Sequence, residues 1–469
     1  MNSLRKNLFF NITYQILILF LPLITSSYLA RVIGAEGIGR YSYAFSIALY
    51  FTYFTLLGLN KYGNRKIASI KNDKGLLSKS FYEIYSMQVI CFVVCFCAYI
   101  ICSLFIFVDR EMSLILAIFV LSSLFDINWF FFGMEMFDKT VIRNTAIKLL
   151  TTILIFTLVE NQDDVNKYAT IMSVGYLVSQ LALWPYLKSC IDRVYICDMS
   201  LKQHWLPNFA MFLPVVAVSL YRILDKIMLG LFSSYEYVGF FENAEKIVAV
   251  PIAVVSALGT VMLPRVTALI SEKKYSDVIK YRDLSVTIVT IFSVGALFGF
   301  IGISEVLVKC LYGEDFEMSG IILRYLAFTL IFLGIGDVIR SQYLIPYRYD
   351  RVYIASAFLG AIVNVILNIV LIPKYQAIGA AIGTIGAEVV VFLYQIGMIR
   401  NSLPLLKYVK NLLLCGIAGI LMLISIENIN SDSSVIELVS RVIVGIFVYM
   451  AICSLLFLRT IRLAFNMRN

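Results

Sequence analysis

Long apolar stretches separated by short polar segments alternate along almost the whole chain. A helix that crosses a bilayer needs about twenty predominantly apolar residues, and fourteen stretches reach or approach this length. In chain order they are Leu8–Ala30, Tyr41–Leu59, Met87–Val108, Met112–Phe132, Thr145–Val159, Ala169–Leu187, Phe209–Phe232, Ile247–Val266, Val286–Val308, Ile321–Val338, Val352–Ile372, Ile378–Ile399, Val409–Ile426 and Val435–Leu458. The pattern predicts an all-α polytopic membrane protein with about 14 transmembrane helices.

Basic residues are distributed unevenly between the segments that join these stretches. When the stretches are threaded alternately through a membrane, 28 of the 39 Lys and Arg residues fall on one side and seven on the other. An excess of Lys and Arg in short loops marks the cytoplasmic side, so we expect both termini in the cytoplasm. Thr145–Val159 is the shortest stretch, but omitting it would reverse the sidedness of every later segment. Leu8–Ala30 leads to Arg31 and not to a small-residue cleavage site, so we expect a retained first helix and no signal peptide.

The composition excludes several classes of protein. Hydrophobic residues make up 60% of the chain, charged residues 15%, and the mean hydropathy is +0.86, far from the averages of soluble enzymes. The net charge of +9 comes from residues that flank membrane segments, so we expect no nucleic-acid partner. His204 has no Cys or His partner at ligand spacing, so we expect an exposed loop residue and no metal site. No Gly-x-x-x-x-Gly-Lys-Ser/Thr loop occurs, and we expect no cofactor and no direct use of ATP.

An internal repeat emerges when each position is compared with the position 200 residues later. Residues 35–47 and 235–247 share the pattern Glu-x-x-Gly-x-aromatic-x-x-Ala-x-x-Ile. Each copy joins an odd-numbered helix to the next on the outer side, which indicates a parallel repeat about an axis along the membrane normal. The alternative is a short-turn motif that recurs by chance. The repeat predicts two six-helix lobes around a central cavity, at 1–206 with a cytoplasmic linker and at 207–403, followed by two extra helices at 404–469.

Charged residues inside apolar segments indicate where such a cavity would be polar. A charge within the membrane by default faces a bundle interior or a water-filled cavity. Arg222, Asp225 and Lys226 share one face of the seventh stretch because they are three and four residues apart. The structural alternative for these three residues is a buried ion pair between helices. Further intramembrane polar groups are Asp126, Arg324 and Glu388, the pairs Asp337–Arg340 and Glu437–Arg441, for which we expect salt bridges, and the amides Asn364 and Asn368.

One segment resembles a known family. Residues 128–139, Asn-Trp-Phe-Phe-Phe-Gly-Met-Glu-Met-Phe-Asp-Lys, with Ile142-Arg143-Asn144 and Lys148, are similar to the segment after the fourth helix of bacterial polysaccharide repeat-unit flippases. These are the O-antigen and capsule transporters related to the multidrug and toxin extrusion family. Residues 30–41, 224–247 and 372–381 are also similar to that family. The chain departs from the family pattern at Phe240-Phe241-Glu242, where a Tyr-Ser pair is usual.

The resemblance implies a transporter, not an enzyme, in the bacterial cytoplasmic (inner) membrane. Its cargo would be an undecaprenyl-diphosphate-linked oligosaccharide, moved from the cytoplasmic to the outer leaflet by alternating access and driven by a proton or sodium gradient. Membrane lipid, and a polymerase and a chain-length regulator of the same pathway, would be its other partners. The expected diphosphate contacts are Arg31, Arg222, Lys226 and Arg324. The expected ion-coupling carboxylates are Asp225, Asp126 and Glu388.

Three alternatives remain open at the level of sequence. A multidrug exporter of the related family would share the architecture but favour an acidic or aromatic cavity. A peptidoglycan-precursor flippase would carry a similar lipid diphosphate. A membrane polysaccharide polymerase would need catalytic residues in a substantial outer loop, and the outer loops here reach only about a dozen residues.

Overall fold

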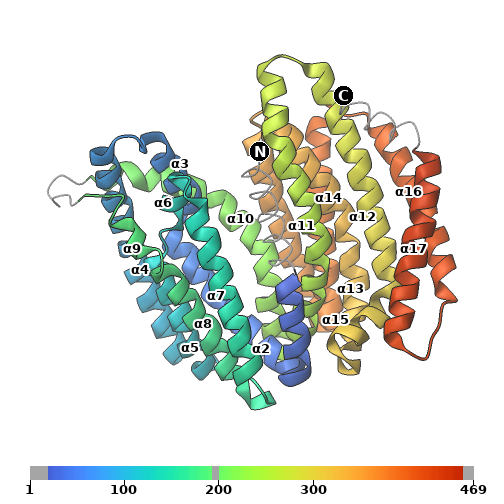
Figure 1. Ribbon diagram of the computed structural model, residues 1–469, viewed down its shortest axis with the longest axis horizontal. Helices are drawn as coiled ribbons and strands as arrows, with labels where there is room; N and C mark the ends of the chain where they lie inside the picture. The colour runs from blue at the N-terminus through green and yellow to red at the C-terminus, as the bar shows by residue number, and fades with distance from the viewer. Residues whose placement is uncertain (1–19, 193–199, 458–469) are drawn as a thin grey trace, which may run out of the picture. The chain divides into compact units, whose positions relative to one another are not determined.

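The structure, a computed structural model, describes residues 20–192 and 200–457, with all side chains in these ranges except those of residues 220–222. Within these ranges the chain forms helices and no β-strand (Figure 1). It divides into two compact units: unit 1 comprises Met1–Gly230 and Ser234–Gly239, and unit 2 comprises Leu231–Ser233 and Phe240–Asn469. The predicted all-α membrane fold is confirmed. The predicted lobe boundaries at 206/207 and 403/404 stay predictions.

Unit 1 begins with helical residues 20–32 and continues through a series of helices of very different lengths. They are α2 (Gly34–Leu56), α3 (Leu59–Ile70), α4 (Lys74–Phe105), α5 (Arg110–Ser122), η1 (Ser123–Phe125), α6 (Asn128–Gly133), α7 (Phe137–Leu158), η2 (Gln162–Asp164), α8 (Val165–Leu181), α9 (Trp184–Leu187) and α10 (Lys202–Phe232). Asp73 and Asp109 cap the N-termini of α4 and α5, because each carboxylate accepts a hydrogen bond from a backbone N–H three residues later.

Unit 2 is built around α12. Its helices are α11 (Tyr235–Ser271), whose first residues belong to unit 1, α12 (Tyr275–Tyr312), η4 (Glu314–Phe316), α13 (Glu317–Ala327), α14 (Thr329–Ile339), the π-helical η5 (Arg340–Leu344), α15 (Asp350–Ile399), η6 (Arg400–Ser402), α16 (Leu405–Glu427) and α17 (Ser434–Leu456). Helices α13, α14, α16 and α17 all pack against α12.

The predicted spans lie on these helices. In the described ranges, nine helices are long and apolar enough to cross a membrane, and the pair Glu314–Ala327 and Thr329–Leu344, bent by 40°, makes a tenth. Helix α15 carries two predicted spans, separated by a break at Gln376, whose φ is 52°. Helices α8 and α10 carry two more. The stretch Thr145–Val159 lies on α7, which is among the nine. The start of the first stretch and the end of the last lie outside the described residues.

The two copies of the repeat contact each other reciprocally at their glycines. A Cβ atom at Gly39 would collide with the backbone carbonyl of Tyr235, and a Cβ atom at Gly239 would collide with that of Ala35. Position 39 therefore contacts position 235, and position 239 contacts position 35. Both contacts lie within unit 1, where the two glycines allow the backbones of α2 and α11 to approach closely.

Two predicted salt bridges are present, and one sequence prediction is wrong. Arg340 pairs with Asp337 at 3.2 Å, and Arg441 pairs with Glu437 at 2.7 Å. His204, expected to be an exposed loop residue, is only 1% exposed. Its ring lies 2.8 Å from Glu83 of α4, because the first turn of α10 packs onto that helix. Residue spacing along the chain could not reveal this contact between two distant segments.

Candidate functional site

A break in the helical chain positions the polar groups of unit 1. The α5 helix tightens into η1, and the chain then becomes extended at Asp126. The buried amide of Gln88 on α4 holds this break: its Nε2 lies 2.8 Å from Ser123 O, 3.3 Å from Leu124 O and 3.0 Å from Asp126 O. Carbonyls at a helix end lack the usual intrahelical partner; of these three, Ser123 O also accepts from Asp126 N at 3.4 Å. One side chain thus satisfies a helix end that lies inside the bundle.

The aromatic block after the break anchors it to the rest of unit 1. Trp129, Phe130 and Phe131 are fully buried. The indole Nε1 of Trp129 donates to Gln88 Oε1 at 3.1 Å. A Cβ atom at Gly63 of α3 would lie 2.7 Å from Trp129 Cε3, so α3 can approach the ring only with glycine there. The Trp129 block is therefore a packing element that fixes the orientation of α6.

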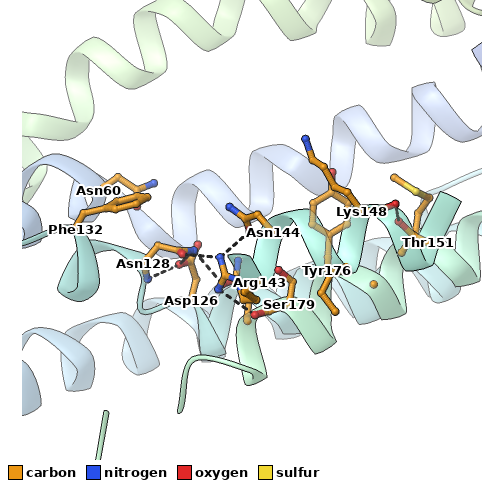
Figure 2. Close-up of a pocket in the computed structure, with 14 residues that line it drawn as sticks. Asn60, Asp126, Asn128, Phe132, Arg143, Asn144, Lys148, Thr151, Tyr176 and Ser179 are labelled. Carbon is orange, nitrogen blue, oxygen red and sulfur yellow. Dashed lines mark hydrogen bonds between the residues drawn. The ribbon is translucent and has the colours of Figure 1, made fainter. Parts of the chain in front are cut away.

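A pocket of about 330 Å³ opens beside this break. Ligand pockets have volumes of roughly 300 to 1,000 Å³. Four amide side chains line it, those of Asn60, Asn128, Asn144 and Gln180. Figure 2 shows Arg143 at the centre of a hydrogen-bonded group, with Phe132 on one side and Tyr176 and Lys148 on the other. The pocket lies wholly within unit 1.

Neutral oxygen atoms hold the guanidinium of Arg143. Its Nη1 donates to Ser179 O at 3.0 Å, and its Nη2 donates to Asn128 Oδ1 at 2.9 Å and to Asn144 Oδ1 at 2.8 Å (Figure 2). The residue is 9% exposed. Arg143 thereby connects α6, α7 and α8 and fixes the amides of Asn128 and Asn144 in one orientation.

Asp126 supplies the carboxylate of the pocket and is also 9% exposed. Its Oδ1 accepts from Asn128 N at 3.0 Å and from Asn128 Nδ2 at 2.7 Å. A short side chain that accepts from the backbone two residues later stabilises a turn, which explains why the chain changes direction here. No residue of the described ranges donates to Oδ2.

The right-hand side of the pocket in Figure 2 combines an aromatic ring with a cation. Tyr176 of α8 is 37% exposed and packs against Phe119 with ring centroids 4.8 Å apart. Lys148 of α7 is half-buried and forms no ion pair or hydrogen bond through its ammonium group with the described residues. The site therefore offers amides, one carboxylate, one available cation and an aromatic face. Such a set binds polar, hydroxyl-rich or anionic groups and contains no nucleophile paired with a base.

The predicted site residues lie at several places. In unit 1, Arg31 is exposed, Asp225 is 2% exposed and Lys226 is half-buried. Arg222 lies in α10, but its side chain is outside the described residues. Asp126 lines the pocket.

In unit 2, Arg324 is in the last turn of α13, where it pairs with Glu305 at 2.5 Å and donates to Ser304 Oγ at 2.7 Å. Glu388 is 5% exposed within α15.

A second cavity, in unit 2, is apolar. It has a volume of about 460 Å³ and lies between α12, α16 and α17. Isoleucine, phenylalanine and methionine side chains line most of it. Arg441 lines it as well and donates to Ile429 O and Gly302 O. This cavity suits a hydrocarbon chain better than a polar ligand.

Sequence reasoning missed the role of several pocket residues. Arg143, Asn144 and Lys148 were recognised only as part of a family-like segment and as cytoplasmic-side charges. Their spacing along α7 places them within about a turn and a half of one helix, and this was an available signal. Ser179 and Gln180 gave no signal, because they lie in an apolar stretch far along the chain.

Comparisons with known proteins point to the family that the sequence resembles. Residues 4–270 match the family described as polysaccharide biosynthesis protein. The chain is 22% identical over 407 residues to a protein of Escherichia coli (strain K12) named "Putative O-antigen transporter", covering 85% of this chain and 97% of that protein. It is 21% identical over 378 residues to the capsular polysaccharide biosynthesis protein CapF of Staphylococcus aureus, covering 74% and 87% of the two chains.

A likeness to a solved structure concerns the fold. The lipid II flippase MurJ, in an inward closed conformation, superposes with a TM-score of 0.76 at 16% identity. The match covers 96% of this chain and 100% of that one. At this identity the likeness establishes a shared helical architecture.

Proposed function

The chain belongs to the polysaccharide biosynthesis protein family, and from this premise we propose that it moves lipid-linked oligosaccharides across the membrane. The cargo is an undecaprenyl-diphosphate-linked repeat unit of O-antigen, capsule or exopolysaccharide. It passes from the cytoplasmic to the outer leaflet of the bacterial inner membrane by alternating access, and no bond is made or broken. The observation that carries the proposal is the similarity to an O-antigen transporter over 85% of this chain.

The physical need for such a protein is clear from the cargo. A diphosphate and several sugars cannot cross hydrocarbon unaided, because their polar groups would lose their hydrogen bonds to water. A protein lowers this barrier by offering polar and cationic groups within the membrane. The pocket around Arg143 and Asp126 supports the proposal, since it offers such groups on apolar helices.

The diphosphate contacts and the ion-coupling groups are part of the proposal. Arginine and lysine side chains bind phosphate oxygens through charge-assisted hydrogen bonds. The proposed diphosphate contacts are Arg31, Arg222, Lys226 and Arg324. The proposed carboxylates that couple turnover to a proton or sodium gradient are Asp225, Asp126 and Glu388.

Substitution of Arg222 tests its assigned role. If Arg222 contacts phosphate, Arg222→Ala abolishes surface polysaccharide at unchanged protein abundance, and Arg222→Lys retains part of it. If Arg222 is half of a structural pair with Asp225, the single variants lose abundance, because a partner charge is left buried. In that case the double variant Arg222→Leu/Asp225→Leu recovers function, and Arg222 is not a diphosphate contact.

Deleting the gene tests the function. The proposal predicts that long-chain surface polysaccharide is lost while complete lipid-linked repeat units accumulate facing the cytoplasm. A polymerase would instead leave single units on the outer side, attached to their surface acceptor. An exporter of drugs would leave the polysaccharide unchanged. A peptidoglycan-precursor flippase would cause arrest of wall synthesis with the polysaccharide pathway intact.

A further inference from the structure

The pocket of unit 1 has hydrogen-bonding capacity that the protein itself does not use. Gln180 Oε1 accepts from Asn128 Nδ2 at 3.0 Å, but within the described ranges nothing accepts from Gln180 Nε2. Asn144 Oδ1 is occupied by Arg143, and its Nδ2 has no acceptor there. Asp126 Oδ2 accepts no hydrogen bond from the described residues, because both bonds from Asn128 go to Oδ1. Each amide is therefore fixed through one atom, while the other remains available to a ligand.

The aromatic lining narrows the class of ligand. Tyr176 and Phe132 both line the pocket, and Tyr176 has more than a third of its surface exposed. A sugar ring has hydroxyl groups around its edge, which both donate and accept hydrogen bonds, and an apolar C–H face, which packs against an aromatic ring. Side-chain amides and a carboxylate match the hydroxyl groups in both directions. The pocket combines both features.

Other occupants fit less well. A lipid chain would leave Asp126 Oδ2 and the available N–H groups of Gln180 and Asn144 without hydrogen bonds, which is costly in a buried site. An isolated phosphate would find the guanidinium of Arg143 engaged by three oxygen atoms, and only Lys148 available as a cation. The two cations also disfavour a sugar that carries a free ammonium group.

We propose that this pocket is a carbohydrate-binding site that holds one sugar ring of the cargo. Gln180, Asn144 and Asp126 bond its hydroxyl groups, and Tyr176 packs against its face. The assignment rests on the proposed function for the identity of the cargo. It adds a site that recognises the sugar, separate from the cationic residues assigned to the diphosphate. On the predicted topology, α7 begins at the cytoplasmic side, where the cargo is loaded.

Direct binding tests the site. The probe is the lipid-free repeat-unit oligosaccharide released from the surface polysaccharide of the wild-type organism. Its affinity for the purified full-length chain in lipid nanodiscs is measured by saturation-transfer NMR titration. Gln180→Glu keeps the oxygen that Asn128 uses and removes the available donor. One hydrogen bond to a ligand is worth about 0.5–1.5 kcal/mol, so we expect Gln180→Glu and Asn144→Ala to weaken binding about two- to tenfold.

Two further variants separate binding from folding. Asn166→Ala removes a half-buried amide of α8, the helix that carries Gln180 and Tyr176. Asn166 does not line the pocket, so this variant should leave the affinity unchanged. Tyr176→Ala should weaken binding, whereas Tyr176→Phe, which keeps the ring, should restore it. Because Tyr176 also packs against Phe119, Tyr176→Ala should lower the melting temperature. Affinity is therefore measured well below that temperature, where our proposal predicts that the folded variant still binds weakly and a purely structural role predicts the wild-type affinity.

The outcomes distinguish this site from the proposed function. If the wild-type chain does not bind the oligosaccharide, or the pocket variants bind it as tightly as the wild type, the carbohydrate site is refuted. If in that case the deletion strain still accumulates cytoplasm-facing units, the proposed function stands without the site. If the deletion strain displays normal polysaccharide, the proposed function fails, and the pocket loses its assigned cargo.

Discussion

Replacing Gln88 by leucine should release the helix break that positions the pocket. The two side chains have similar size, so the substitution removes hydrogen bonds without opening a large cavity. The Gln88 amide donates to the carbonyls around residues 123–126 and accepts from the indole of Trp129. Gln88 is 0% exposed, so water cannot replace these contacts.

The structure sets the size of the effect. The Gln88 amide donates two N–H groups and accepts one from the indole, so leucine takes a donor from the backbone carbonyls and the acceptor from Trp129 Nε1. A lost hydrogen bond costs about 0.5–1.5 kcal/mol and an unsatisfied buried group about 1–3 kcal/mol. Hydrogen bonds between membrane helices average about 0.6 kcal/mol, so the cost of each lost bond should lie toward the lower of these values. We therefore expect Gln88→Leu to lower the free energy of unfolding by about 2–4 kcal/mol.

Gln395 provides a matched control in unit 2. It is 1% exposed, and its Nε2 makes one side-chain hydrogen bond, to Ser356 Oγ at 2.9 Å. Gln395→Leu should therefore cost about 1 kcal/mol. Both variants are measured by reversible unfolding of the purified protein in mixed detergent micelles. Transport should fall in Gln88→Leu as well, because Asp126 and Asn128 lose their fixed position. If Gln88→Leu costs no more than the control, our explanation of the helix break is wrong.

Three further predictions concern the predicted topology, the repeat contact and one charge pair. The predicted topology places Cys310 on the outer side and Cys190 in the cytoplasm. An impermeant maleimide added to cells with a permeabilised outer barrier should therefore label Cys310 and leave Cys190 unlabelled; labelling of Cys190 alone would show that the topology is inverted. Gly39→Ala should lower the melting temperature by several degrees, since its Cβ would collide with a backbone carbonyl; an unchanged value would refute this packing. Although burial raises the pKa of Asp109, hydrogen bonds from Arg40 and a backbone N–H lower it overall. Its ionised form thus stabilises the fold above the unfolded pKa of about 4, and this stabilisation is lost as the pH falls through the folded value. The difference in stability between the wild type and Asp109→Asn should therefore be full at pH 6 and shrink below about pH 4, and a constant difference would contradict the assignment.

Hydrophobic pattern and charge predicted the fold because both are imposed locally by the bilayer. A span such as Thr145–Val159 must be apolar and helical whatever it contacts, and the structure places it on α7. The repeat was readable because Gly39 and Gly239 are both required by a close backbone approach. The sequence also indicated an interruption near Gln376 inside α15, since Pro373 lies between two predicted spans.

The pocket could be predicted only in part. Asp126 was found because a carboxylate in an apolar segment is conspicuous. Its partners Arg143 and Gln180 come from two other helices, and sequence spacing does not reveal which helix faces meet. His204 was misjudged for the same reason, since its burial depends on Glu83, 121 residues away. The Trp129 block was recognised by resemblance, yet its aromatic side chains form the core, and the polar residues beside it line the pocket.

Reconstitution tests the central claim most directly. The purified chain is placed in liposomes that contain a fluorescent undecaprenyl-diphosphate-linked repeat unit in both leaflets, and an impermeant glycosidase is added outside. If the protein moves the lipid-linked unit across the bilayer, the enzyme digests the inner-leaflet pool as well, and digestion proceeds to completion. If digestion stops when the outer leaflet is exhausted, as in protein-free liposomes, the chain does not flip this cargo and our account is contradicted.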